Sequence, residues 1–292
     1  MCGIVGLFTK SPSLERRLGE HVAAMLVELS ERGPDSAGLA VYRRPAAAGF
    51  SKLVLFHPDE AFDWAGLAAE LDAELEQRAT HAILTTRLSL DRVREHLALH
   101  PGLRLMSAGQ SIEIFKEKGL PADVVRRFDL KDIAGSHAIG HTRMATESAV
   151  TTEHSHPFST GLDLCLVHNG SLSNHNRLRE RLRHEGIAFQ TDNDSEVAAG
   201  YLTWRMGQGA SLHEALEAAL RDLDGFYTFC VGTADGFAVL RDPIACKHAV
   251  LAETEDWVAM ATEYRAIARL PGAGKARIWE PAPAQVYSWT RH

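Results

Sequence analysis

The chain has 292 residues, of which 45% are apolar and 24% are charged, close to the average of globular proteins. This composition argues against a disordered, collagen-like or coiled-coil chain, and the net charge of −7 argues against a nucleic-acid-binding surface. No apolar run approaches the 18 residues of a membrane span. Residues 1–6 lack the basic and apolar regions of a signal peptide, so a cytoplasmic protein is the default expectation.

The first half of the chain predicts strands and helices in alternation. An apolar run predicts a strand over 3–8, apolar residues at helical spacing predict a helix over 14–31, and 38–42 predicts a second strand. Between 46 and 135 we expect helices over 62–78, 90–99 and 122–129 and short strands over 82–86, 103–107 and 112–115. In the helix over 62–78, Leu67, Leu71 and Leu75 should face inward. This alternation indicates an inserted α/β elaboration over about 46–135.

The second half predicts mostly antiparallel strands. We expect strands over 137–142 and 164–168 and helices over 173–184, 194–206 and 212–223. The C-terminal third should contain strands over 226–231, 236–241, 248–252, 257–261 and 284–289. Since few long helices separate these strands, antiparallel pairing is expected. The whole chain, 1–292, is interpreted as a single domain with one insertion.

One of the four cysteines is placed where it can react. None stands in a C-x-x-C pair, which argues against a zinc cluster or a redox dithiol, and Cys165 and Cys230 lie in apolar runs typical of packed core thiols. Cys2 follows Met1, and removal of the initiator methionine would give a cysteine with both a thiol and a free α-amine. An α-amine with a pKa of about 7.7–8 can activate that thiol as a base. An incidental terminal cysteine is the alternative.

Five polar segments stand at expected strand ends or helix starts: 2–6, 32–38, 140–146, 168–170 and 191–196. A thiolate that attacks a carbonyl needs donors for the resulting oxyanion, and Asn169 with Gly170 can supply a side-chain amide and a backbone N–H. Asn-Gly is also a common turn sequence, and the two interpretations are compatible.

Two charged residues suit an α-amino-acid substrate. Arg143 can bind a carboxylate through two hydrogen bonds, and Asp194 can accept from an ammonium. The alternatives are a surface position for Arg143 and a helix N-cap role for Asp194, with Asp192 a competitor for either role. His154 and His156 have a spacing that can bind zinc, but no third ligand is obvious, so no metal site is predicted. We expect His141 and His168 to be structural hydrogen-bonding groups.

The five segments, in this order, resemble the class II glutamine amidotransferases, which are N-terminal-nucleophile (Ntn) hydrolases. Residues 224–227, 241–243 and 261–263 resemble the closing strands of that domain, so the likeness runs almost end to end. The resemblance implies an α+β fold, a four-layer αββα sandwich of two antiparallel sheets. It implies hydrolysis of L-glutamine to glutamate and ammonia, with the following roles: Cys2 as nucleophile with its α-amine as base, Asn169 and Gly170 as oxyanion hole, and Arg143, Asp194, Arg32 and Thr146 at the substrate.

The chain departs from the family at two places. Met144 stands where the family often has Trp, and the 46–135 region is longer than in the minimal domain. That region and residues 140–148 resemble stand-alone amidotransferase subunits related to glutamate synthase, in particular that of N-methylglutamate synthase. Because the last expected strands reach almost to His292, we expect no acceptor domain in this chain.

The resemblance therefore implies glutamate-synthase-like partner subunits that carry FMN and iron–sulfur clusters, with no cofactor in this chain. Two alternatives remain. The chain could be a stand-alone γ-glutamyl amidohydrolase, or a subunit that binds glutamate or glutamine without glutaminase activity.

Overall fold

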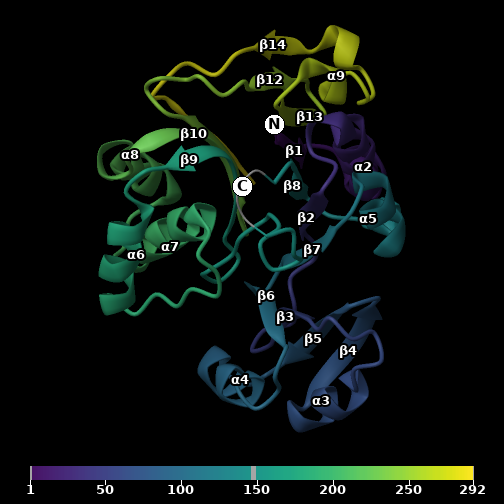
Figure 1. Ribbon diagram of the computed structural model, residues 1–292. Helices are drawn as coiled ribbons and strands as arrows, with labels where there is room; N and C mark the ends of the chain where they lie inside the picture. The colour runs from purple at the N-terminus through teal and green to yellow at the C-terminus, as the bar shows by residue number, and fades with distance from the viewer. Residues whose placement is uncertain (1, 146–148, 292) are drawn as a thin grey trace.

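A computed structural model describes residues 2–145 and 149–291, and within these ranges the strands form three antiparallel sheets (Figure 1). The first sheet has the order β14 (Arg277–Trp279), β12 (Val250–Glu253), β13 (Trp257–Ala261), β1 (Gly3–Thr9), β8 (His137–Arg143), β2 (Ser36–Tyr42) and β7 (Ile112–Lys118). The second has the order β15 (Val286–Thr290), β11 (Gly236–Arg241), β10 (Gly225–Thr233) and β9 (Cys165–Leu172). The third has the order β4 (Ala73–Arg78), β5 (His81–Thr86), β3 (Ser51–Phe56) and β6 (Arg104–Gly109).

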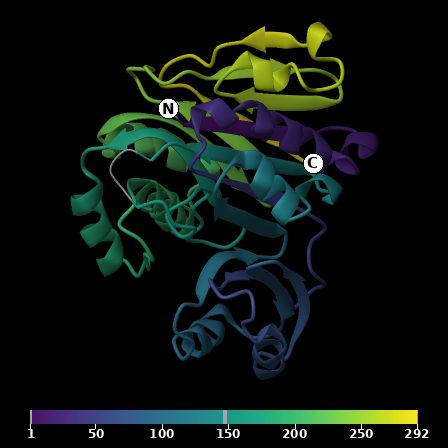
Figure 2. The same cartoon turned by 45° about the vertical axis from the view of Figure 1, so that its right-hand side comes forward.

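Helices cover the outer faces of the first two sheets. The first sheet is covered by α2 (Leu18–Glu28), α5 (Pro121–Arg127) and α9 (Tyr264–Ile267), with the short α1 (Pro12–Glu15) beside β1. The second is covered by α6 (His175–His184), α7 (Asp194–Gly207) and α8 (Leu212–Asp222). The result is the expected four-layer αββα arrangement (Figures 1 and 2). None of the helices in the described ranges is long and apolar enough to cross a membrane.

Side-chain alternation along β1 determines what each face touches. A Cβ built on Gly6 would lie 3.1 Å from the Cys230 sulfur, and the Phe8 ring lies 6.1 Å from that of Phe237, so both face the second sheet. A Cβ on Gly3 would instead meet Leu29 beyond α2. Because strand side chains alternate with a period of two, Cys2 falls on the face that looks toward the second sheet.

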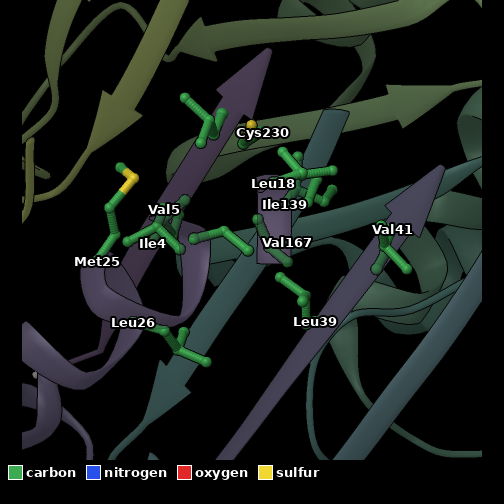
Figure 3. Packing of buried hydrophobic residues seen from close by; sticks show 14 of the residues in the cluster. Ile4, Val5, Leu18, Met25, Leu26, Leu39, Val41, Ile139, Val167 and Cys230 are labelled. Carbon is green, nitrogen blue, oxygen red and sulfur yellow. The ribbon is translucent and has the colours of Figure 1, made fainter. Parts of the chain in front are cut away.

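The core fills the space between the sheets and under α2. Figure 3 shows Met25 and Leu26 of α2 against Val5 of β1, with Val167 and Cys230 from the second sheet close by. All five side chains are fully buried. Burying an aliphatic side chain of this size contributes about 1.5–3 kcal/mol, so this packing gives the strand ends a rigid support.

The third sheet forms a separate layer over residues 51–109, narrower than the 46–135 expected. It carries α3 (Trp64–Glu70) and α4 (Leu90–Leu97), which Figure 1 shows beside its strands. It also has its own apolar cluster. Within the expected insertion, β7 pairs with β2 and α5 packs on the same sheet, so both belong to the sandwich.

One predicted helix is wrong in its second half. Instead of a single helix over 62–78, α3 ends at Glu70 and β4 follows, paired with β5. Asp72 takes a left-handed conformation, φ 45°, which stops the helix. Leu67 and Leu71 are buried as expected, but Leu75 is 38% exposed on an edge strand. The spacing of the three leucines fits a helix, and only the pairing of β4 with β5 shows that the second half of this segment is a strand.

The other predicted helix and strand boundaries differ less from those in the structure. The helix expected over 14–31 is divided into α1, α2 and a 3₁₀ turn, Ser30–Arg32. The strands β3 and β14 and the short α9 were not expected. Two further 3₁₀ turns are Leu130–Asp132 and Ala273–Lys275.

Candidate functional site

Cys2 is tied to both sheets through its backbone carbonyl. The Asn169 side-chain amide donates a hydrogen bond to the Cys2 oxygen at 3.2 Å, and Nε of Arg32 donates to the same oxygen at 3.1 Å. The thiol is half-buried and lies 3.8 Å from the Met144 carbonyl oxygen. Cys2 thus lies beside the Asn169–Gly170 corner, although Cys2 and Asn169 are 167 positions apart in sequence.

An ion-pair network holds Arg32 in place. Its guanidinium pairs with Glu263, which follows β13, and Glu263 also pairs with Arg265 at 2.6 Å. Although partial burial opposes it, the pairing with Arg32 holds the pKa of Glu263 below its ordinary value. Arg32 therefore links the end of the first sheet to the Cys2 backbone.

The Asn169–Gly170 corner lies within β9 and is not an isolated turn. Both residues pair with β10, Asn169 opposite Thr228 and Gly170 opposite Tyr227. Gly170 has φ 149°, and a Cβ there would lie 1.9 Å from the Phe226 carbonyl oxygen and 2.8 Å from Nε2 of His168. Only glycine fits this backbone.

Arg143 is the last residue of β8 and is buried, not a surface arginine. It lies on the same face of the strand as His141, toward the second sheet, and its guanidinium donates to the Ala149 carbonyl at 3.1 Å. Asp35 supports the following loop, because its carboxylate accepts from the Ala145 N–H at 2.8 Å. Thr146 lies outside the described residues.

Asp194 is the first residue of α7, and Asn193 is the N-cap, so the alternative N-cap role for Asp194 is wrong. The Asn193 side chain accepts from the Ser195 N–H at 2.8 Å. The Asp194 carboxylate instead accepts from the Leu172 N–H at 2.9 Å, which joins the start of α7 to the end of β9. Its side chain is 22% exposed, accessible to a small ligand.

Three buried histidines pack behind Asp194. His156 and His168 each approach Oγ of Ser195 at 2.9 Å, and Nε2 of His141 lies 3.0 Å from the His168 carbonyl. The His141 ring stacks on His156 with centroids 4.0 Å apart. Burial lowers the pKa of His141 to about 3 and that of His156 well below its ordinary value. These rings are neutral at physiological pH and act as hydrogen-bonding groups, as expected of His141 and His168.

The other candidates lie apart from this group. Asp192 is exposed and pairs with His154 at 3.2 Å, so His154 and His156 point to different partners. In the part of the chain that the structure describes, no group of three or more His, Cys, Asp or Glu side chains could hold a metal ion. Burial raises the pKa of Cys165 to about 12, which makes it an unreactive thiol.

The structure therefore gathers Cys2, Arg32, Arg143, Asn169, Gly170 and Asp194 at one end of the sandwich, from both sheets. Sequence reasoning missed the supporting residues Asp35, His156, Ser195 and Glu263. Asp35 and Ser195 lie inside the polar segments 32–38 and 191–196, but a polar side chain there does not show which group it will meet. Nothing in the sequence pattern predicted that Lys116 of β7 would be buried.

The chain resembles known proteins along its full length. A family model described as a glutamine amidotransferase domain matches residues 141–269. The glutamine amidotransferase-like protein GlxB of Rhizobium meliloti (strain 1021) is 56% identical over 99% of this chain and 98% of its own. A putative glutamine amidotransferase of Methanothermobacter thermautotrophicus (strain Delta H) is 31% identical over 98% of this chain and 99% of its own.

Solved structures show the same fold. The glutamine phosphoribosylpyrophosphate amidotransferase from B. subtilis superposes with a TM-score of 0.63 at 20% identity, over 99% of this chain. This chain spans about half the length of that protein, since 49% of the larger chain is covered. From the relatives that match end to end and from this fold, the chain belongs to the class II glutamine amidotransferase family, with the Ntn-hydrolase fold.

Proposed function

We propose that this chain is a glutaminase subunit that hydrolyses L-glutamine to glutamate and ammonia through Cys2. Family membership supports amide chemistry on glutamine. One observation supports the assignment to Cys2 above the others: the Asn169 amide and the Arg32 guanidinium both donate to the Cys2 backbone oxygen, at 3.2 and 3.1 Å. They position the N-terminal cysteine against donors that can stabilise an oxyanion.

The chemistry begins with removal of Met1, which frees the Cys2 α-amine. The amine takes the thiol proton, and the sulfur attacks the carboxamide carbon of glutamine to give a tetrahedral intermediate. A side-chain amide nitrogen carries two hydrogens, so Asn169 can keep its bond to Cys2 and donate the other hydrogen to the oxyanion. The Gly170 N–H is the second donor. Returning the proton to nitrogen expels ammonia, and water then hydrolyses the thioester to glutamate.

Two residues would orient the substrate. The buried guanidinium of Arg143 would bind the glutamine α-carboxylate, since a planar fork matches a carboxylate through two hydrogen bonds. The Asp194 carboxylate would accept from the α-ammonium. We assign Thr146, three positions after Arg143 in the sequence, to the same substrate.

We further propose that the ammonia passes to a glutamate-synthase-like partner that carries FMN and iron–sulfur clusters, N-methylglutamate synthase in particular. The likeness of 46–135 and 140–148 to such stand-alone subunits supports this assignment. Free ammonia released into water would be lost to the acceptor, which is the physical reason for a partner.

The test is glutamate release by the complex purified from its own cells, with intact mass spectrometry of this subunit. We expect a mass that lacks Met1, and loss of more than a thousandfold in kcat for Cys2→Ala. Cys246→Ser is the matched control, because Cys246 is an exposed free cysteine, and its rate should stay within twofold of the wild type. Retained methionine, or unchanged hydrolysis by Cys2→Ala, would overturn the assignment. Activity of the chain alone would favour the stand-alone amidohydrolase.

A further inference from the structure

The hydroxyl of Ser195 lies at the centre of a small buried hydrogen-bond group. It is 2.9 Å from Nε2 of His156, 2.9 Å from Nδ1 of His168 and 3.3 Å from Oδ1 of Asp194. Ser195 is 2% exposed and both rings are buried, so these contacts are shielded from water. Asp194 alone faces outward, toward the site described above.

The positions of the hydrogens follow from the inventory of donors. A carboxylate only accepts, so the hydrogen bond between Ser195 and Asp194 uses the single Ser195 hydrogen. The serine oxygen then has only acceptor capacity left for the two rings. Both histidines must therefore donate, His156 through Nε2–H and His168 through Nδ1–H.

A second observation agrees with this assignment. Neutral imidazole carries one hydrogen, so the assignment leaves Nδ1 of His156 and Nε2 of His168 unprotonated. His141 donates through Nε2 to the His168 carbonyl, which leaves its Nδ1 unprotonated. These three nitrogens are the ring atoms of the group that have no partner among the described residues. Each is a bare acceptor, which costs less to bury than an N–H without an acceptor.

We infer that Ser195 is a positioning residue that selects for the α-ammonium of the substrate through Asp194. This inference rests on the proposed function, because it takes Asp194 as the ammonium-binding group. Ser195 holds Oδ1 and the Leu172 N–H holds Oδ2 at 2.9 Å, so both oxygens of the carboxylate are fixed. Their remaining lone pairs stay available for the ligand.

The histidines set the direction of the Ser195 hydroxyl without adding a positive charge. Burial lowers the pKa of all three, so none carries a positive charge at neutral pH that would compete with the ligand's ammonium for Asp194. The serine hydroxyl cannot turn away from Asp194 without placing its hydrogen against a ring N–H. The group thus behaves as a one-way chain of donors ending on the carboxylate.

The test compares two ligands that differ in the ammonium alone, L-glutamine and glutaramate, which is glutamine without its α-amine. Equilibrium binding is measured by calorimetry on the complex with Cys2→Ala, so that nothing is hydrolysed. Adding Ser195→Ala should weaken L-glutamine binding about tenfold and leave glutaramate binding within twofold. Ser107→Ala, at another buried serine, is the matched control and should change neither affinity.

Ser195→Cys keeps a weaker donor of similar size and should give an intermediate loss for glutamine alone. It also serves if Ser195→Ala does not fold. Equal loss for both ligands, or no loss for glutamine, would overturn the role of Ser195 while leaving the glutaminase assignment intact. If the Cys2→Ala complex binds neither ligand, the proposed substrate fails, and the inference fails with it.

Discussion

Strand β8 carries a buried histidine near each end, and the two ends of the sandwich differ in how those rings are satisfied. At the far end, His137 uses both ring nitrogens, with Ser136 Oγ at 2.9 Å and the Thr233 carbonyl at 2.8 Å, and stacks on Tyr42. At the other end, which contains Cys2, His141 uses one nitrogen, and the other has no partner among the described residues.

Burial lowers the pKa of both rings to about 3, so burial alone does not distinguish the two ends. What differs is spare hydrogen-bonding capacity. The far end is closed, with each polar atom of the ring paired, as in a purely structural contact. The end with Cys2 leaves ring acceptors available close to the site. Changes at the far end should therefore alter stability, and changes at the Cys2 end should alter activity.

The largest expected effect is at Asn169. Asn169→Ala removes both the proposed oxyanion donor and the hydrogen bond to Cys2, and loss of one such donor costs about 10²–10³ in kcat. Glutamate release by the complex measures it, with the melting temperature as the check on folding. A fall of less than tenfold would contradict the oxyanion role and weaken the contrast between the two ends.

Part of this site could be predicted from the sequence, because its residues lie in short polar segments that follow apolar runs. The runs over 3–8, 137–142 and 164–168 became β1, β8 and β9, with ends shifted by at most four residues. Strand alternation then places Cys2 and Arg143 on one face. The meeting of Cys2 with Asn169 required the sheets to pack, which no local pattern specifies; the family resemblance supplied it.

The supporting group could not be predicted. Ser195 looks like an ordinary residue in the first turn of a helix, and its role depends on two histidines from other segments. The division of 62–78 into α3 and β4 also depends on pairing with β5, which outweighs the helical spacing of three leucines. Non-local contacts decided both cases.

Glycines at the two ends of the β9–β10 pair give a matched comparison. Gly170→Ala places a Cβ 1.9 Å from a backbone carbonyl at φ 149°, a strain of roughly 1–3 kcal/mol, and should also lower glutaminase activity at least tenfold. Gly232→Ala, opposite Cys165, would press on the Tyr42 ring at 2.7 Å and should destabilise the fold without that loss of activity. Denaturant unfolding and kinetics measure the two effects. Equal loss of activity in both variants would remove the distinction between the ends.

A change at the far end should alter stability and its dependence on acid. His137→Leu leaves the Thr233 carbonyl without its donor and should cost about 1–2 kcal/mol at pH 7, with kcat/KM within twofold of the wild type. The folded pKa, about 3, lies below the unfolded value near 6.5, so the unfolded chain binds the proton first as the pH falls. The wild type should therefore lose stability between pH 6.5 and 3, and the variant should lose less. A parallel pH dependence of the two would contradict the neutral, buried His137.

The smallest effect concerns a buried cation near the Cys2 end. Lys116 donates to the carbonyls of Glu153, Ser155 and Pro157 and so holds the segment that carries His156, and burial lowers its pKa to about 8 from about 10.5. Between these values the unfolded chain keeps a proton that the folded chain has lost, so stability rises with pH.

Relative to Lys116→Met, the unfolding free energy of the wild type should increase by about 1 kcal/mol from pH 7.5 to 9. Urea titrations of both proteins at these two pH values measure the difference, because the other titrating groups are common to both. A constant difference would mean that Lys116 stays charged, and the Cys2 end would then hold a permanent buried charge, unlike the far end with its neutral ring.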